Sequence, residues 1–335
     1  MITRDITRRM FLARSAAAAL TAASPLARAA AAATPSATAK SSTGRPMISV
    51  GGSVGASSGV MAAALKLAAQ ELGTAEAEFK AMAQPLALLG LRNGTVQSAF
   101  LSWANFGQNQ EQGIQVVAIA PAWASHASFL VRPDAPYKTI ADLAGKRLGS
   151  SPRTTGVFSE GAAALAAQGM SIEKDVRLTP MDQSPVLVAL FKKGDFDALL
   201  VSEPAVSILL ASGAARELLQ VGTFEASRHG GRFTPVNSWG LRKDWLDHQD
   251  RDAMVKLFTR ASEIAKTRKE PFAEAGKASG LDDRTTDLFR ERFSKLIVTR
   301  FTDENLADAQ TLMDQAQKDG LIKTKHRVTD FVVKA

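Results

Sequence analysis

The stretch KTIADLAGKRLGSSPRTTG, residues 138–156, decides the fold, because it combines a helix end, a strand and a polar loop that opens another helix. Gly145 is the kind of residue that ends a helix in a left-handed cap, and the strand predicted at residues 147–150 ends in serine. The apolar residues within 157–168 then fit one face of a helix. Because a helix start presents unpaired N–H groups, the hydroxyls of this loop stand where a small anion would bind.

Strands and helices alternate on both sides of this stretch. Before it, the pattern predicts strands at residues 47–50, 78–82, 95–101 and 115–120 and helices at 60–72 and 86–92. From it onward, it predicts strands at residues 147–150, 176–179, 198–201 and 218–221 and helices at 157–168, 185–193 and 204–212. This alternation predicts parallel sheets with right-handed crossovers. The remainder is mainly helical, most clearly at residues 253–267, 285–293 and 305–317.

Two further strands connect the alternating units. Residues 128–131 leave the first unit and residues 236–241 return to it. We therefore predict an α/β protein of two lobes, each a mostly parallel sheet flanked by helices, with hinge strands at residues 128–131 and 236–240. The predicted limits are 46–127 plus 238–335 for lobe I and 128–237 for lobe II. A ligand is expected between the lobes, at the carboxyl ends of the strands.

The N-terminus carries an export signal. Arg8 and Arg9 precede Met10-Phe11-Leu12, an alanine-rich stretch and a small-residue cleavage pattern, which is typical of a twin-arginine signal peptide over residues 1–29. Residues 30–45 read as a flexible leader. The sequence thus predicts a periplasmic protein, with no stable membrane insertion after signal cleavage.

Charge and composition exclude several classes of function. The formal net charge is +8, and residues 1–29 hold five arginines against one aspartate, so their removal leaves only +4. This mild excess gives no nucleic-acid-binding surface. With no cysteine and four scattered histidines, the chain has no thiolate site and no metal-ligand spacing, and we expect neither metal nor cofactor.

A family resemblance rests on two groups of residues in and after the opening stretch. They are Ile140, Asp142, Leu143, Gly145, Lys146, Leu148 and Gly149, followed by Asp182, Ala189, Leu190, Gly194, Asp197, Ala198, Glu203 and Pro204. This pattern resembles the substrate-binding proteins of ABC importers, in the nitrate, sulfonate and taurine group that includes thiamine-pyrimidine binders. It covers nearly all of the chain after about residue 46. Enzymes of this fold that make pyrimidines carry a cysteine-rich motif absent here.

The resemblance implies a type II periplasmic binding protein. Such a protein is a monomeric receptor, not an enzyme, and its partners are a small-molecule ligand and the permease subunits of the importer. A receptor that feeds a sensor kinase is the alternative partner arrangement.

The candidate ligand-binding residues follow the predicted strand ends. They are Ser53, Ser57, Ser58, Gln84, Ser102, Trp103, Asn105, Trp123, Ser151, Arg153, Thr154, Thr155, Asp182, Gln183, Glu203, Asn237 and Trp239. Hydroxyls at helix starts, as at Ser57, Ser58, Thr154 and Thr155, suit an oxyanion, although each could instead cap only its own helix. Arg153 could equally be a solvated surface cation.

The nature of the ligand depends on the other candidates. If two of the three tryptophans line the cleft, the ligand is an organic sulfonate or a small ring and not nitrate; the alternative is that they pack between layers. A carboxylate at Glu203 would repel an anion, so its presence in the cleft would favour a ligand with a cationic amine or a ring N–H. The alternative is that Glu203, before Pro204, is a helix-start residue that does not contact the ligand. A pyrimidine remains the alternative ligand.

The competing class of function is a serine hydrolase. Residues 51–55, GGSVG, match G-x-S-x-G between a strand and a helix, with Ser53 as the nucleophile. Against it, this is the first strand of the fold, and none of the four histidines lies in a context that marks a partner base.

Overall fold

The computed structural model describes residues 44–53, 56–153, 155–181 and 184–333. The predicted signal peptide and all but the end of the leader lie outside these residues, as do the candidate site residues Thr154, Asp182 and Gln183. All described elements belong to the compact unit Pro35–Ala335.

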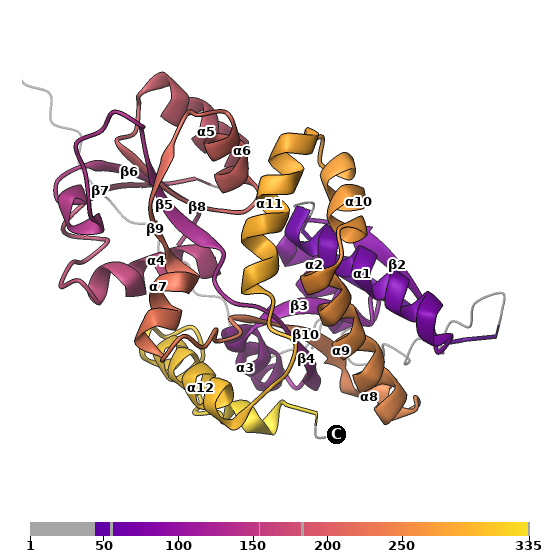
Figure 1. The fold of residues 1–335 in the computed structure, drawn as a ribbon. Coiled ribbons are helices and arrows are strands. Elements are labelled where there is room, and N and C mark those ends of the chain that lie inside the picture. Colours follow the sequence, from indigo (N-terminus) through magenta and orange to yellow (C-terminus); the bar gives the residue numbers. More distant parts are fainter. Residues whose placement is uncertain (1–43, 54–55, 154, 182–183, 334–335) are drawn as a thin grey trace, which may run out of the picture. The chain divides into compact units, whose positions relative to one another are not determined.

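Two five-stranded sheets organise the described part of the chain (Figure 1). The first has the order β2-β1-β3-β10-β4 and consists of β1 Met47–Gly52, β2 Glu76–Ala81, β3 Ser98–Ser102, β4 Val116–Trp123 and β10 Asn237–Arg242. The second has the order β7-β6-β8-β5-β9 and consists of β5 Ala127–Val131, β6 Arg147–Ser150, β7 Arg177–Pro180, β8 Ala198–Ser202 and β9 Arg216–Gln220. We call the parts built on these sheets lobe I and lobe II. The predicted two-lobe α/β class is confirmed.

The two sheets have the same plan. In each, the strand second in the order runs parallel to both of its neighbours, and the strand fourth in the order is antiparallel to both of its neighbours. Four strands of each sheet therefore run in one direction and one strand is reversed, so each sheet is mostly parallel, as predicted. The antiparallel strands are β10 in lobe I and β5 in lobe II, which are the two strands predicted to be hinges.

Two layers of helices cover the sheet of lobe I. One face carries α1 Ala56–Leu72, α9 Arg251–Thr267, α10 Glu270–Ala278 and α11 Asp283–Leu296. The other face carries α2 Gln84–Asn93, α3 Trp103–Glu111 and α12 Asp303–Lys318. Because side chains alternate along a strand, Phe100 enters the first core and Leu101 the second. The short helix α8 Lys243–Leu246 follows β10.

Lobe II is sandwiched in the same way. One face of its sheet packs on α4 Gly156–Ala166 and α7 Val221–Arg228, and also on the 3-10 turn Ile140–Leu143. The other face packs on α5 Ser184–Lys193 and α6 Ala205–Ala211. Gly145, after the 3-10 turn, has φ 70°, the left-handed conformation that the opening stretch predicts.

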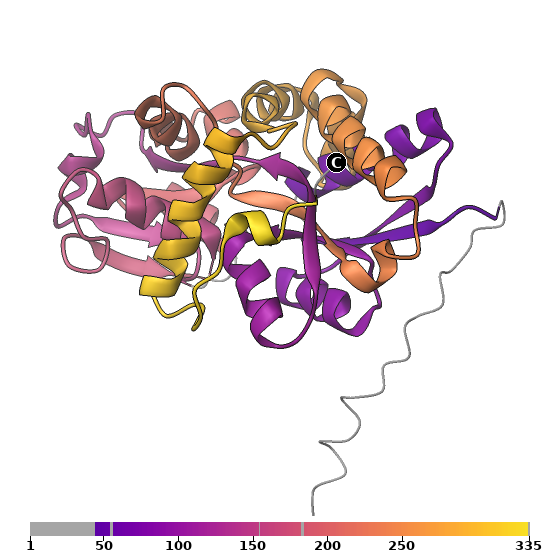
Figure 2. The ribbon, with the colours of Figure 1, turned by 90° about the horizontal axis from the view of Figure 1, so that it is seen from below.

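The links between the lobes differ from the predicted hinges. Residues 128–131 and 237–240 belong to β5 and β10, which are hydrogen-bonded on both sides within a sheet. The chain instead crosses between sheets at residues 124–126 and 229–236. The hinge prediction was wrong in position because an alternating apolar run looks the same in a connecting strand and in a central strand. Helices α11 and α12 lie along the boundary of the lobes, as Figures 1 and 2 show.

Two helix predictions need correction. Helix α1 begins at Ala56 and not at residue 60, so Ser57 and Ser58 lie in its first turn. Helix α7 was not predicted, because Gly222 weakens its helical pattern. This glycine is required by packing: a Cβ atom there would lie 2.2 Å from the carbonyl oxygen of Ser125.

Candidate functional site

The first link, residues 124–126, lies where both lobes meet, and each lobe bonds to it. Helix α11 accepts a hydrogen bond at Leu296 O from Ala124 N, 2.9 Å away. From lobe II, Gln220 Nε2 donates to Ser125 O over 2.9 Å. The backbone of Ala124 and Ser125 is therefore hydrogen-bonded to both lobes. Neither residue was a candidate from the sequence, because a three-residue connection has no periodicity to mark it.

Three serines lie at the end of β1 and in the first turn of α1, and one of them contacts this link. Ser57 and Ser58 are buried in that turn, and Ser58 Oγ lies 3.2 Å from Ser53 Oγ at the end of β1. Ser57 Oγ lies 3.4 Å from Nδ1 of His126. The close approach needs Gly52, where a Cβ atom would lie 3.0 Å from Cβ of Ser58. We call Ser53, Ser57 and Ser58 the serine cluster.

His126 is a neutral imidazole in an aromatic setting. Its ring centroid lies 5.9 Å from that of Trp123 and 5.4 Å from that of Phe293. Burial lowers the pKa of His126 to about 4, because the charged form loses its hydration. The indole Nε1 of Trp123 is buried and has no hydrogen-bond partner among the described residues.

Lobe II contributes a carboxyl group to the same link. Glu160, in the second turn of α4, accepts a hydrogen bond from Ser125 Oγ. Its other oxygen folds back over the start of its own helix, since a Cβ atom at Gly156 would lie 2.9 Å from Oε1. Burial raises the pKa of Glu160 to about 7, and the bond from Ser125 only partly opposes this.

A second contact between the lobes is made by Arg292 of α11. Its Nε donates to Glu203 Oε1 over 2.7 Å and its Nη1 donates to Glu217 over 3.1 Å. Its Nη2 donates to Ser128 Oγ over 3.4 Å. Burial opposes the charge of Arg292, but the bonds and charges of the two glutamates raise its pKa above the ordinary value. The guanidinium therefore stays charged.

Glu203 is thus not a free carboxylate facing a ligand. It is 5% exposed, pairs with Arg292 and accepts hydrogen bonds from N and Oγ of Ser207 in the first turn of α6. Its charge is compensated from both sides, so the repulsion of an anion expected from the sequence does not follow.

The three tryptophans that were predicted as candidates have different positions in the structure. Trp239 is fully buried and its Nε1 donates to Ser262 Oγ over 3.2 Å, while Trp103 is 2% exposed and donates to Pro235 O over 2.7 Å. These contacts give both residues packing roles in lobe I, which corrects the idea that they stack on a ligand. Only Trp123 lies beside the link.

Most other candidates are occupied within their own lobe. Ser102 and Asn105 form the capping box of α3, and Gln84 Nε2 donates to Phe100 O over 3.0 Å. Arg153 forms a two-bond pair with Glu173 on the surface. Thr155 caps α4 through the N–H of Phe158.

Two candidates remain at the edges of the sheets that face the link. Ser151 is buried after β6. Asn237, at the start of β10, pairs with Ser102 and with Trp123 in the neighbouring strands.

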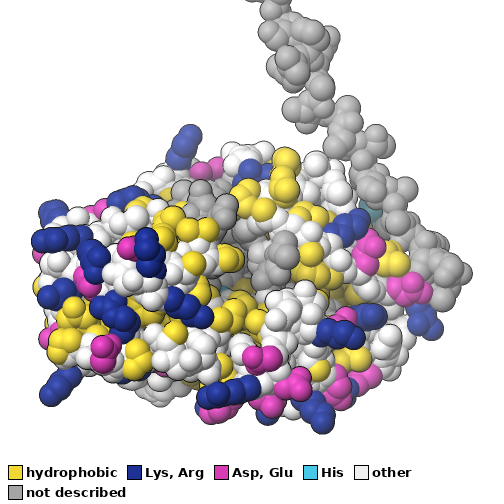
Figure 3. Space-filling model, turned by 90° about the horizontal axis from the view of Figure 1, so that it is seen from above, with side chains coloured by type: hydrophobic (Ala, Val, Ile, Leu, Met, Phe, Trp, Pro, Cys, Tyr) yellow, Lys and Arg dark blue, Asp and Glu magenta, His cyan; other side chains and the backbone are white. Residues whose placement is uncertain are grey.

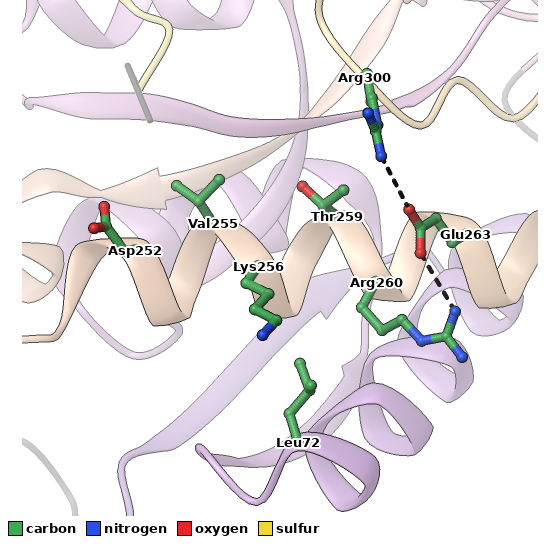
Figure 4. Close-up of a pocket in the computed structure, with 8 residues that line it drawn as sticks. All are labelled: Leu72, Asp252, Val255, Lys256, Thr259, Arg260, Glu263 and Arg300. Carbon is green, nitrogen blue, oxygen red and sulfur yellow. Dashed lines mark hydrogen bonds and ion pairs between the residues drawn. The ribbon is translucent and has the colours of Figure 1, made fainter.

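Few charged side chains lie in the middle of one face of the molecule. Figure 3 shows basic side chains mainly over lobe II and at the edges of this face, with apolar and uncharged side chains towards its middle. A concavity of about 490 Å³ lies elsewhere, along α9 in lobe I (Figure 4). Its charged residues are partly paired, Arg260 and Arg300 both with Glu263, and it does not touch the link.

The comparisons with known proteins identify the class of protein to which this two-lobed fold belongs. A sequence model described as "ABC transporter, phosphonate, periplasmic substrate-binding protein" matches residues 69–277. The chain is a periplasmic substrate-binding receptor of an ABC importer, as the sequence pattern predicted. More particularly, it belongs to the family of phosphonate-type periplasmic substrate-binding proteins that this model describes. No curated protein matches the sequence.

Solved structures share the fold at low identity. The aliphatic sulphonate binding protein SsuA of Escherichia coli is 18% identical, with a TM-score of 0.69 over 85% of this chain and 96% of that chain. The alkanesulfonate-binding protein SsuA of Xanthomonas axonopodis pv. citri, bound to MOPS, is 18% identical, with a TM-score of 0.68 over 87% and 99%. The desulfurization enzyme DSZB is 16% identical, with a TM-score of 0.61 over 86% and 96%. These likenesses show the fold, which both receptors and an enzyme use.

No helix among the described residues is long and apolar enough to cross a membrane. Within the same residues, no group of three or more histidine, aspartate or glutamate side chains is arranged to hold a metal ion.

Proposed function

We propose that this receptor captures a small organic anion with a sulfonate or phosphonate head group. The observation that carries the proposal is the serine cluster at the end of β1 and the start of α1, where Ser57 contacts His126. Three neutral hydroxyls and the free N–H groups of a helix start suit an oxyanion, because they bind the charge without a counter-charge of their own. The SsuA proteins of similar fold, which bind sulfonates, support this choice of head group.

Neighbouring groups add to the proposed site. Neutral His126 can donate or accept through its ring, and Trp123 offers an indole N–H that has no partner in the described part of the chain. The rings of Trp123 and Phe293 provide an apolar wall for the carbon chain of the ligand. From lobe II, Ser151 and backbone N–H groups at the start of α4 complete the proposed set, with Thr155 as the cap of that helix.

Binding would act by population shift. A ligand held by α1 of lobe I and by α4 of lobe II gains both sets of contacts only when the lobes are closed, so it favours the closed form by that difference in affinity. We propose that the permease reads this closed form. The lobe limits 46–127 plus 238–335 and 128–237, and the monomeric state, stay part of the proposal.

Export by the twin-arginine route is proposed from residues 1–29. Replacing Arg8 and Arg9 together by lysine is expected to leave the precursor in the cytoplasm, which fractionation and immunoblotting would detect. Processing at the wild-type rate would contradict this route.

The proposal excludes catalysis by Ser53. Its hydroxyl contacts Ser58, whereas the histidine of this region contacts Ser57, so the pair that a hydrolase needs is not formed at Ser53. No turnover of a chromogenic ester is expected, and turnover abolished by Ser53→Ala would reverse this conclusion.

The test is a thermal-shift and calorimetry panel on the mature protein. Ethanesulfonate and ethylphosphonate are expected to raise the melting temperature, since a ligand at a hundred times its Kd adds about 2.7 kcal/mol to stability. Nitrate and cytosine are expected to have smaller effects. Ser57→Ala should weaken binding, whereas Ser227→Ala, which removes an exposed hydroxyl bonded only within α7, should not. Stabilisation by cytosine alone would overturn the proposal.

A further inference from the structure

The second link between the lobes, residues 229–236, is attached to lobe I at both of its ends. At its C-terminal end, Val236 N donates to Trp123 O over 3.0 Å. The carbonyl oxygen of Pro235 accepts a hydrogen bond from the indole of Trp103 over 2.7 Å. The N-terminal end of the link follows directly on α7 of lobe II, and it is held by a different kind of contact.

A single carboxylate of lobe I holds the start of the link. Oδ1 of Asp308, on α12, lies 2.8 Å from Nδ1 of His229, and Oδ2 lies 3.4 Å from Nη2 of Arg232. The side chain of Asp308 is 13% exposed, so water screens these contacts less than it screens an ordinary surface pair. Figure 1 shows α12 next to α7. We call His229, Arg232 and Asp308 the clasp.

Two glycines lie between the two residues of the link that belong to the clasp. Gly230 and Gly231 have φ 65° and 85°, in the left-handed region that glycine adopts without a steric penalty. Two such residues in succession let the backbone change direction at little cost in energy. Residues on both sides of this bendable point, His229 and Arg232, therefore bind the same carboxylate.

Opening of the lobes would disturb these contacts. Helix α7 packs on the sheet of lobe II and α12 packs on the sheet of lobe I. A rotation of lobe II about Gly230 and Gly231 would therefore draw His229 away from Asp308. The other carboxylate near this imidazole, on Glu225, is 3.9 Å from its Nε2 but belongs to α7 itself, so it cannot join the two lobes.

We propose that the clasp is a conformational device, which holds the second link in the described form and must release before the lobes can open. The lobes are in contact in this form, for example through Arg292 and Glu203. A clasp that favours contact between the lobes raises the fraction of receptor able to bind with both of them, and with it the apparent affinity. This inference goes beyond the proposed ligand class and does not depend on it.

The distance between two spin labels tests the proposal on the mature protein without any ligand. The links leave the sheets at β4, β5, β10 and, through α7, β9, whereas β2 and β7 are the outermost strands at the other edge of each sheet. Helices α2 and α5 follow those two strands and therefore separate when the lobes open about the links. The chain has no cysteine, so Leu89→Cys on α2 and Lys192→Cys on α5, both at exposed positions, carry the labels.

Asp308→Ala removes both contacts of the clasp. The ratio of long to short label distances is expected to rise at least about threefold, the size of effect that one ion pair near the surface gives. Asp314→Ala is the matched control on the same helix, because the carboxylate of Asp314 accepts its hydrogen bond from Gln310 of α12 itself. The ratio should keep its wild-type value in this control.

Gly231→Ala tests the link without changing Asp308. Alanine disfavours the left-handed φ of this position, and no atom lies within 4 Å of the new Cβ, so the substitution destabilises the clasped backbone without a clash. The ratio should again rise. Gly280→Ala, between α10 and α11, imposes similar backbone strain at φ 68°, also in open space. It should lower stability without changing the ratio.

Melting temperatures verify that each labelled variant is folded. An unchanged or lower ratio in Asp308→Ala overturns the proposal, and so does an equal rise in Asp314→Ala. A wild-type protein that shows only the long distance overturns it as well, because the clasp would then not hold the lobes together. If Asp308→Ala does not fold, the two glycine variants decide, and equal ratios in Gly231→Ala and Gly280→Ala overturn the proposal. None of these results bears on the proposed ligand.

Discussion

Nε of Arg292 lies 2.7 Å from Oε1 of Glu203, and this pair joins a helix packed on lobe I to the buried start of α6 in lobe II. The side chain of Glu203 is 1% exposed and that of Arg292 is 17% exposed, so both charges are largely removed from water. Removing only one of them would leave the other without compensation.

Arg292→Met is therefore expected to lower the free energy of unfolding by about 3–5 kcal/mol. Urea unfolding followed by circular dichroism measures this loss. Arg290→Met is the matched control on the same helix, because Arg290 is exposed and its nearest carboxylate, on Asp287, is 3.8 Å away. That change should cost less than about 1 kcal/mol. Equal losses in the two variants would mean that the pair is not important for stability.

Glu160 should make stability depend on pH above about pH 4.5. Its pKa is about 7 in the folded chain against an ordinary 4.5, so between these values the folded state holds a proton that the unfolded state has released. The free energy of unfolding should then fall as pH rises through this range, by at most about 3 kcal/mol. Glu160→Gln should remove this fall, which urea titrations at pH 5 and pH 8 would measure. An unchanged difference between the two pH values would contradict the assignment.

His126 should make the free energy of unfolding fall as the pH drops below about 6.5, opposite to the effect of Glu160. Its pKa is about 4 in the folded chain against an ordinary 6.5, so below pH 6.5 the unfolded state binds a proton that the folded state resists. Stability should fall as pH drops from 6.5 to 4, by at most about 3 kcal/mol, and His126→Gln should reduce that loss. The control is His248→Gln, at an exposed position, which should keep the wild-type acid profile.

Gly222→Ala tests the packing of α7 against the link. The new methyl group would lie 2.2 Å from Ser125 O, a backbone atom that cannot move alone, so we expect a loss of at least about 1–3 kcal/mol in the free energy of unfolding. Gly90→Ala is the control within a helix, because its nearest contact would be an ordinary 3.4 Å. That substitution should be neutral or stabilising, by up to about 1 kcal/mol. A stable Gly222→Ala protein would contradict the close approach.

Two tryptophan substitutions separate packing from binding. Trp123→Phe is expected to weaken binding of ethanesulfonate at least about threefold, because it removes the N–H without a described partner. Trp239→Phe should lower stability through the lost bond to Ser262 while leaving affinity unchanged. Calorimetry measures the affinity and thermal melts measure the stability of both variants. Weaker binding by Trp239→Phe, with unchanged binding by Trp123→Phe, would contradict these roles.

Local sequence signals predicted most of the fold. The alternation of strands and helices, the left-handed Gly145 and the polar start of α4 all depend on neighbours within a few residues, which a pattern can reveal. The serines at the start of α1 were also found this way, although the helix begins earlier than its apolar pattern does. Gly59 and the two serines of that first turn hide the boundary.

The sequence could not reveal the residues whose roles depend on distant partners. Arg292 meets Glu203 across 89 positions and Glu160 meets Ser125 across 35, and no local pattern encodes either contact. The prediction that the tryptophans contact a ligand failed for Trp103 and Trp239 for a related reason. A position near a strand end places a residue at an edge of the sheet, but it does not determine whether the side chain points to the ligand or into the core. Trp103 and Trp239 turn to the core.

The pairing of β4 with β10 has a consequence for how this chain can be divided. Trp123, the last residue of β4, is the antiparallel partner of Asn237, the first residue of β10, while all five strands of lobe II lie in between. Lobe II is thus an insertion at the tip of a hairpin, and a tight turn joining these two residues would spare every strand of the first sheet. Transplanting residues 124–236 between receptors would exchange all of lobe II as a single cassette.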